Sequence, residues 1–178
     1  MLKTFFSHRN RLLTGLIVSS AVLLLSGCGR KFSISVNDQM LYDPRPGTSG
    51  VVVADAGLQS CINVLMRQRG LTDVEQIQVL ACPLLEIESL AGINQLVNLR
   101  FLDLAGNQLM NLDGLAGAKN LSSINAPDNR LQDISAILQI PTLSSAVMTG
   151  NQLIPCSQLE VLQAKLDNSL LAPERCMP

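Results

Sequence analysis

The apolar residues of this chain recur at intervals of 22 positions, and this period restricts the fold more than any other feature of the sequence. Seven positions of the repeat can be followed through four copies. The clearest series are Ile77, Leu99, Leu121 and Leu143; Leu80, Leu102, Ile124 and Ala146; and Ile93, Leu115, Ile137 and Leu159. A fixed period of roughly 20–29 residues is typical of solenoids, in which each copy forms one unit that stacks on its neighbours. We therefore expect stacked units over about residues 71–155.

The second copy contains the repeat motif in its clearest form. Residues 99–112 read LRFLDLAGNQLMNL and follow the pattern L-x-x-L-x-L-x-x-N-x-L-x-x-L. This pattern resembles leucine-rich repeats, and the 22-residue length is similar to the short repeats of bacterial internalins. Over about residues 55–178 the resemblance implies an α/β repeat solenoid of about four units, each adding a short strand to a parallel sheet. It is specific for the fold and says nothing about function.

The first copy fits the motif in two registers. At strict 22-residue spacing, Leu85 occupies the position where the later copies have asparagine. An alternative register begins at Val74, has Ile77 and Val79 as its strand pair, and puts Cys82 at the asparagine position, which the repeat allows. The alternative needs three extra residues before the second copy. We favour it for the strand, and the boundaries near 74–90 stay open.

The recurring asparagines, Asn107, Asn129 and Asn151, are predicted to be structural. Each follows a strand where the chain turns, and its amide can satisfy backbone groups that the turn leaves unpaired. We expect these side chains to stabilise the units rather than to bind a ligand.

Both ends of the repeat array are predicted to be closed by helical caps, because terminal solenoid units otherwise expose apolar core. In the N-terminal cap, 55–70, Asp55 is a good N-cap and the apolar residues share one helical face. In the C-terminal cap, 156–178, we expect Ser157 to begin a helix that carries Leu159 and two further leucines.

Residues 1–27 have the features of an export signal. Lys3, Arg9 and Arg11 precede an apolar run from Leu12 to Leu25, and no acidic residue lies among them. The run has 14 residues, whereas a membrane-spanning helix needs about 20. A short transmembrane anchor is the alternative.

The sequence Leu25-Ser26-Gly27-Cys28 resembles the bacterial lipobox. The resemblance implies that the signal is cleaved before Cys28 and that this cysteine carries the covalent lipid, including a palmitate-like acyl chain. The residue after it is Gly29 rather than aspartate, which in Gram-negative lipoproteins favours the outer membrane. We expect a mature protein anchored there and facing the periplasm.

The segment between the lipid and the repeats, 28–54, is interpreted as a tether and lead-in. Residues 32–36 alternate apolar and polar side chains, which predicts a strand. Residues 42–50 contain turn residues and prolines, which predict a stiffened stalk.

Four cysteines remain once Cys28 is acylated, and three pairings are formally possible. An exported protein meets an oxidising compartment, which favours disulfides over free thiols. By proximity within the predicted caps, we expect Cys61–Cys82 at one end and Cys156–Cys176 at the other.

The composition excludes several kinds of chemistry. Cleavage after residue 27 removes three basic residues and no acidic one, which leaves 10 basic against 14 acidic residues and argues against nucleic acid. The only histidine, His8, leaves with the signal, so His-dependent catalysis and His-ligated zinc are not expected. We found no phosphate-binding loop, and we expect no cofactor, no metal and no enzyme activity.

A binding site is expected on the concave face, which the outward residues of the stacked strands form. Arg100, Phe101 and Asp103 are the predicted contact centre, because hot spots favour aromatic residues and arginine. The rest of the candidate face consists of Ser123, Asn125, Ser145 and Val147. The alternative is that these are ordinary surface residues.

Together these features suggest a lipid-anchored envelope protein that binds an unknown protein partner. The second hypothesis is a structural or assembly factor of an envelope complex that binds through residues 32–50.

Overall fold

The computed structural model describes residues 32–46 and 50–176. The predicted export signal and Cys28 therefore lie outside the described residues. The first described element is an antiparallel hairpin of β1 (Ile34–Val36) and β2 (Gln39–Tyr42). Its two turn residues, Asn37 and Asp38, both have positive φ, as two-residue hairpin turns that match the strand twist require. The alternation at 32–36 thus predicted β1, whereas β2 was not foreseen.

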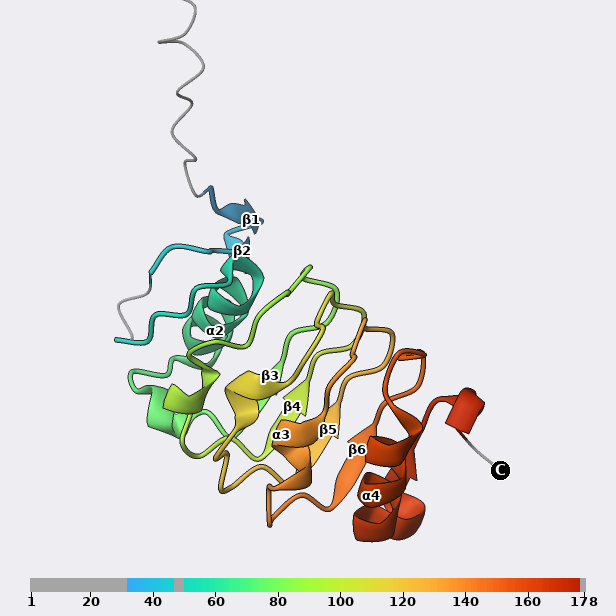
Figure 1. Cartoon of the computed structure of the whole chain (residues 1–178). Helices are drawn as coiled ribbons and strands as arrows, with labels where there is room; N and C mark the ends of the chain where they lie inside the picture. The colour runs from blue at the N-terminus through green and yellow to red at the C-terminus, as the bar shows by residue number, and fades with distance from the viewer. Residues whose placement is uncertain (1–31, 47–49, 177–178) are drawn as a thin grey trace, which may run out of the picture. The chain divides into compact units, whose positions relative to one another are not determined.

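The repeats build a five-stranded parallel sheet with the order β3-β4-β5-β6-β7 (Figure 1). The strands are β3 (Val79–Ala81), β4 (Phe101–Asp103), β5 (Ser123–Asn125), β6 (Ser145–Val147) and β7 (Leu170–Leu171). Residues 22 apart face each other from β3 to β6, so that Leu80 pairs with Leu102 and Leu102 with Ile124. This register confirms the predicted repeat fold with parallel strands.

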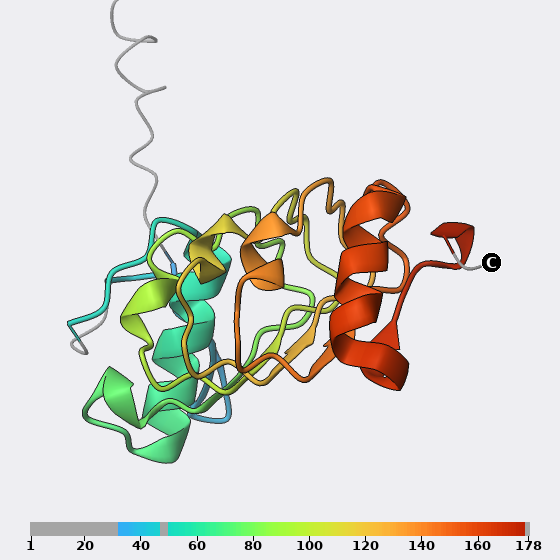
Figure 2. The same ribbon diagram turned by 60° about the horizontal axis from the view of Figure 1, so that its bottom comes forward.

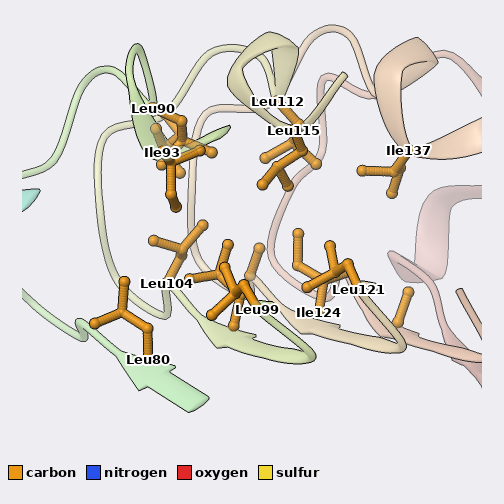
Figure 3. Packing of buried hydrophobic residues seen from close by; sticks show 14 of the residues in the cluster. Leu80, Leu90, Ile93, Leu99, Leu104, Leu112, Leu115, Leu121, Ile124 and Ile137 are labelled. Carbon is orange, nitrogen blue, oxygen red and sulfur yellow. The ribbon is translucent and has the colours of Figure 1, made fainter. Parts of the chain in front are cut away.

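Short helical turns complete the units on the side away from the strands (Figure 2). They are the 3-10 helices Ile93–Gln95 and Asp113–Leu115, followed by α3 (Ser135–Leu138). The core lies between the two sides, where Leu80, Leu99 and Leu121 point toward Ile93 and Leu115 (Figure 3). These side chains are almost completely buried, and each leucine contributes roughly 1.5–3 kcal/mol before conformational entropy is subtracted.

The favoured register of the first copy was wrong. Val79 is 53% exposed, whereas Leu80 and Cys82 are completely buried, as strict 22-residue spacing requires. The reason lies in what the asparagines do: the amide of Asn107 accepts hydrogen bonds from the backbone of Leu85 and Ile87 in the preceding unit. The first copy has no preceding unit, so it needs no asparagine at position 85.

The helix α2 (Ala56–Arg69) precedes the sheet and packs against β2 and β3. It begins at Asp55, whose carboxylate accepts from the backbone N–H of Leu58, and it ends at Gly70 in the left-handed conformation. The second carboxylate oxygen of Asp55 accepts from the N–H groups of Glu88 and Ser89 in the first unit. One side chain therefore begins the helix and joins it to the repeats.

The last unit is covered by α4 (Cys156–Leu166), which packs against α3 and β7. The predicted N-cap, Ser157, is wrong: the N-cap is Pro155, two residues earlier, which makes no side-chain hydrogen bond, and the helix begins at Cys156. Three further 3-10 helices lie outside the repeat period, at Val74–Gln76, Asp167–Ser169 and Glu174–Cys176.

Polar contacts hold α4 on the last unit. Gln158 donates to Asp133 and accepts from the N–H of Ile134. The backbone N–H of Ser135, followed by Gln158, lowers the pKa of the Asp133 carboxyl. Lys165 donates to the carbonyl groups of Leu138 and Ile140, and burial lowers the pKa of its ammonium group.

Both predicted disulfides are confirmed. Cys61 in α2 is joined to Cys82, which follows β3, with 5.6 Å between their Cα atoms. Cys156 at the start of α4 is joined to Cys176, with 5.4 Å between their Cα atoms. Each closes a loop of about 20 residues, a length for which loop entropy predicts roughly 3 kcal/mol of stabilisation.

The proline-containing lead-in is not a free stalk over its whole length. Asp43, Val51 and Val53 are buried. The N–H of Asp43 donates to the hydroxyl of Ser60 in α2, and the N–H of Val53 donates to the Gln59 side chain. The sequence did not predict this packing, because the side chains that bind the lead-in, Gln59 and Ser60, belong to a different element, α2. Within the described residues, no helix has both the length and the apolar character needed to cross a membrane.

Candidate functional site

The outward residues of the strands form the candidate face, which we call the strand face. One row runs through Val79, Phe101, Ser123 and Ser145, and the next through Ala81, Asp103, Asn125 and Val147. In β4, β5 and β6 these residues are half-buried, because each lies beside its partners on the neighbouring strands. The structure therefore brings Phe101 and Asp103 together with four other predicted binding residues, those of β5 and β6.

The polar residues of the strand face are bonded to one another. The Asn125 amide donates to the Asp103 carboxylate over 2.9 Å, and the hydroxyl groups of Ser123 and Ser145 lie 2.7 Å apart. The backbone N–H of Ala105 donates to the same Asp103 oxygen. These bonds fix the side chains in place, so a partner would meet a preorganised polar surface with its remaining lone pairs free.

Exposed apolar residues of the strand face are concentrated at β3. Val79 is 53% exposed and lies directly opposite Phe101 in the register, Ala81 is exposed at the end of the same strand, and Pro83 is exposed just after it. The two outward residues are both apolar on β3, one apolar and one polar on β4 and β6, and both polar on β5. Of the residues that hot spots favour, this end of the face offers an arginine, Arg100, beside the aromatic ring of Phe101.

Leu84, in the turn after β3, is a further exposed apolar residue that was not predicted, and its side chain lies against Gly106 of the next unit. It is 78% exposed and has a φ of 56°, a conformation that costs a bulky L-residue roughly 1–2 kcal/mol. At 22-residue spacing the later copies have Gly106, Asp128 and Gly150, also at positive φ, where small or short polar residues suit the turn. The leucine at a turn position was the signal in the sequence that could have identified it.

Arg100 lies beside the strand face, in a polar groove of about 450 Å³. The groove is lined by Gln78, Asn98, Arg100, Asn120, Ser122 and Thr142. Within the described part of the chain, salt bridges join Asp43 to Arg45 and Arg67, and none involves Arg100. Its exposed guanidinium group is thus free to meet a partner's carboxylate.

The groove contains a second polar series that the sequence reasoning missed. Asn98, Asn120 and Thr142 recur every 22 residues, and each donates to a backbone carbonyl group of the preceding unit. Their repetition was visible in the sequence. Like the three buried asparagines after the strands, they join one unit to the next.

Glu86 and Glu88, two carboxylates that lie two residues apart, are both exposed. Across residues 32–46 and 50–176, no group of three or more His, Cys, Asp or Glu side chains is arranged to hold a metal ion. What the strand face and the groove provide is apolar contact area, hydrogen-bonding groups and one free cation.

Comparisons with known proteins agree with this architecture. No protein-family model matches the chain, and no curated protein matches it. Among solved structures, an internalin (InlF) of Listeria monocytogenes is similar, with a TM-score of 0.53 and 27% sequence identity over 61% of this chain and 34% of that one. Internalin C2 of the same species has a TM-score of 0.51 and 22% identity, over 64% of this chain and 52% of that one.

The class of fold follows from these findings. The parallel sheet, the 22-residue register and the likeness to internalins show a leucine-rich-repeat fold. The chain matches about a third of one internalin and about half of the other.

Proposed function

We propose that this protein is a lipid-anchored component of the bacterial cell envelope that binds a protein partner through its strand face. In this proposal about four leucine-rich repeats, closed by helical caps, hold the face rigid. The protein acts without catalysis or a cofactor, and the observation that carries the proposal is the exposed apolar area around Phe101.

The anchor is inferred from the sequence alone. A basic start, a 14-residue apolar run and the lipobox-like Leu25-Ser26-Gly27-Cys28 favour cleavage before Cys28 and acylation of its thiol. More than one acyl chain is needed for stable anchoring, and lipoprotein modification provides that. Gly29 favours the outer membrane, with the repeats in the periplasm.

The binding role is inferred from the surface. Phe101, Val79 and Leu84 put aromatic and aliphatic area next to a preorganised polar row and the free guanidinium group of Arg100. An open face that is bordered by a groove and combines apolar and polar groups suits a protein surface. The likeness to internalins supports an interaction module of this type.

Alanine at both Arg100 and Phe101 tests the proposal. The acylated protein and the double variant would be chemically crosslinked in native envelopes and purified, and their adducts compared by mass spectrometry. We expect the variant to lose the adducts that the wild type forms, while Gln139→Ala, on the helical side, retains them. If the double variant keeps every adduct, the strand face is not the binding site.

The same purified protein tests the anchor. Its intact mass should correspond to a chain that begins at Cys28, carries acyl chains and retains two disulfides. An unmodified N-terminus would contradict the anchor without affecting the assignment of the strand face.

A further inference from the structure

The hairpin of β1 and β2 has an exposed apolar face, which we call the hairpin face. Phe32 is 66% exposed, Ile34 44% and Val36 53%. Alternation along β1 places these three side chains on one side and Ser33 and Ser35 on the other; the register shifts between Ile34 and Ser35, but the extra residue, Leu41, belongs to β2. Tyr42 belongs to the same side as Phe32, because it pairs with Ile34 and its ring centroid lies 5.9 Å from that of Phe32.

The residue that follows the hairpin is bound to the repeat domain, whereas the hairpin face itself remains exposed. Asp43, directly after β2, forms salt bridges with Arg45 and with Arg67 of α2. Its backbone N–H donates to Ser60, and its carbonyl group accepts from Asn63 over 2.8 Å. A two-stranded ribbon is marginally stable by itself, so these contacts give it a defined position at the start of the domain.

The position of the hairpin in the chain indicates what covers its face. Phe32 is four residues after Cys28, and four residues of fully extended chain span at most about 14 Å. If Cys28 is acylated, as proposed above, the hairpin cannot leave the vicinity of the lipid headgroups. Arg30 and Lys31 stand between the two, and basic residues next to an anchor favour anionic phospholipids.

The composition of the face suits the membrane–water interface. Tyrosine is enriched at that depth, which suits Tyr42, and phenylalanine is typical of the apolar face of segments that lie on a membrane, which suits Phe32. The ribbon itself must stay in the headgroup region, because the unpaired backbone groups along its edges need water. Only the side chains of the hairpin face can therefore reach the acyl chains.

We propose that the hairpin face lies on the phospholipid surface beside the acylated N-terminus and orients the repeat domain relative to the membrane. This inference rests on the proposed anchor at Cys28. It makes the membrane contact a property of the folded domain as well as of the lipid. The occupant of this face is phospholipid, whereas the strand face remains available to a protein.

The absence of tryptophan from the sequence permits a direct test. Phe32→Trp and Ser35→Trp each introduce a single fluorophore, the first on the hairpin face and the second on its opposite side. Each acylated protein would be reconstituted into phosphatidylethanolamine–phosphatidylglycerol vesicles with brominated acyl chains. Vesicle flotation shows whether the protein is anchored, and tryptophan quenching shows which side of the hairpin meets lipid.

We expect a blue-shifted emission for Phe32→Trp, with several-fold stronger bromine quenching than for Ser35→Trp. Val36→Trp repeats the measurement at the far end of β1 and should be quenched like the first. Equal, weak quenching of all three in protein that floats with the vesicles would overturn the inference and leave the anchor intact. Protein that fails to float would refute the anchor, and the inference with it. Shielding of Phe32→Trp only in native envelopes would assign the face to a protein partner instead.

Discussion

At the scale of single residues, the buried asparagines show how the repeats are joined. The Asn107 amide donates to the carbonyl groups of Cys82 and Leu104, which belong to successive units, over 2.9 Å each. Its oxygen accepts from Leu85 and Ile87 of the earlier unit. The sequence predicted a structural role correctly, because polar groups at a buried turn must be paired. It could not predict that each asparagine forms hydrogen bonds with the backbone of the preceding unit. For this reason the register favoured for the first copy, which put Cys82 at an asparagine position, was wrong.

Replacement of Asn107 by alanine should leave those buried backbone groups unpaired. We expect a loss of roughly 1–3 kcal/mol in the free energy of unfolding, measured by urea denaturation. Asn125→Ala is the matched control, since Asn125 is half-buried on the strand face and donates to one carboxylate. Equal losses for the two variants would contradict the structural role of Asn107.

Asp43 makes stability depend on pH. The hydrogen bond from the Arg45 side chain lowers the pKa of this carboxyl most, and burial opposes it by raising the pKa. The backbone N–H of Arg45 and the charges of Arg45 and Arg67 lower it further, so that the pKa lies below its ordinary value of 3.8. The folded state therefore binds the proton more weakly than the unfolded chain. The stabilisation is fully present above that ordinary value and is lost as the pH falls through the folded-state pKa.

Asp43→Asn should therefore be less stable than the wild type at neutral pH and should lose less stability below about pH 4. The two proteins should converge in acid, which thermal unfolding between pH 7 and the acid range would measure. Asp38→Asn, on the hairpin turn, controls for the loss of one negative charge. Parallel pH profiles for the wild type and Asp43→Asn would show that the Asp43 contacts contribute nothing.

At the scale of elements, the end helices are positioned by contacts that the repeat period does not describe. Gly57 lets α2 approach the first unit so closely that a Cβ there would collide with the carbonyl oxygen of Leu85. The amphipathic pattern predicted α2 well, including Asp55 and Gly70 at its ends. It could not predict how closely the helix approaches the first unit, because that distance depends on Leu85, which is 28 positions away in the sequence.

Gly57→Ala decides between two opposing effects. Alanine is favoured over glycine inside a helix by about 1 kcal/mol, whereas overpacking against a backbone atom costs typically 1–3 kcal/mol. Because the colliding atom belongs to the backbone, we expect net destabilisation in thermal or urea unfolding. Ala56→Gly, at the neighbouring exposed position, should cost no more than the helix preference of about 1 kcal/mol. A stabilised Gly57→Ala protein would show that α2 does not contact Leu85 closely.

At the scale of the whole molecule, the 22-residue period predicted most of the sheet and failed where the period stops. β7 pairs Leu170 with Ala146, a separation of 24 residues, and was therefore not expected. The hairpin and the buried lead-in were only partly foreseen, because α2 rather than a repeat provides their contacts. Alternation along a strand correctly predicted which side chains of β4, β5 and β6 point outward, whereas their role in binding stays a prediction. Leu84 was missed because the favoured register of the first copy counted it as a repeat leucine rather than as a turn residue.

The central claim is that the strand face binds a protein. Site-specific photo-crosslinking tests it most directly, with a photoreactive phenylalanine analogue placed at Phe101 or, as the control, at Gln139 on the helical side. Irradiation of intact envelopes should give discrete crosslinked protein species from position 101 and none from position 139. Crosslinks from position 139 with none from position 101 would contradict the account.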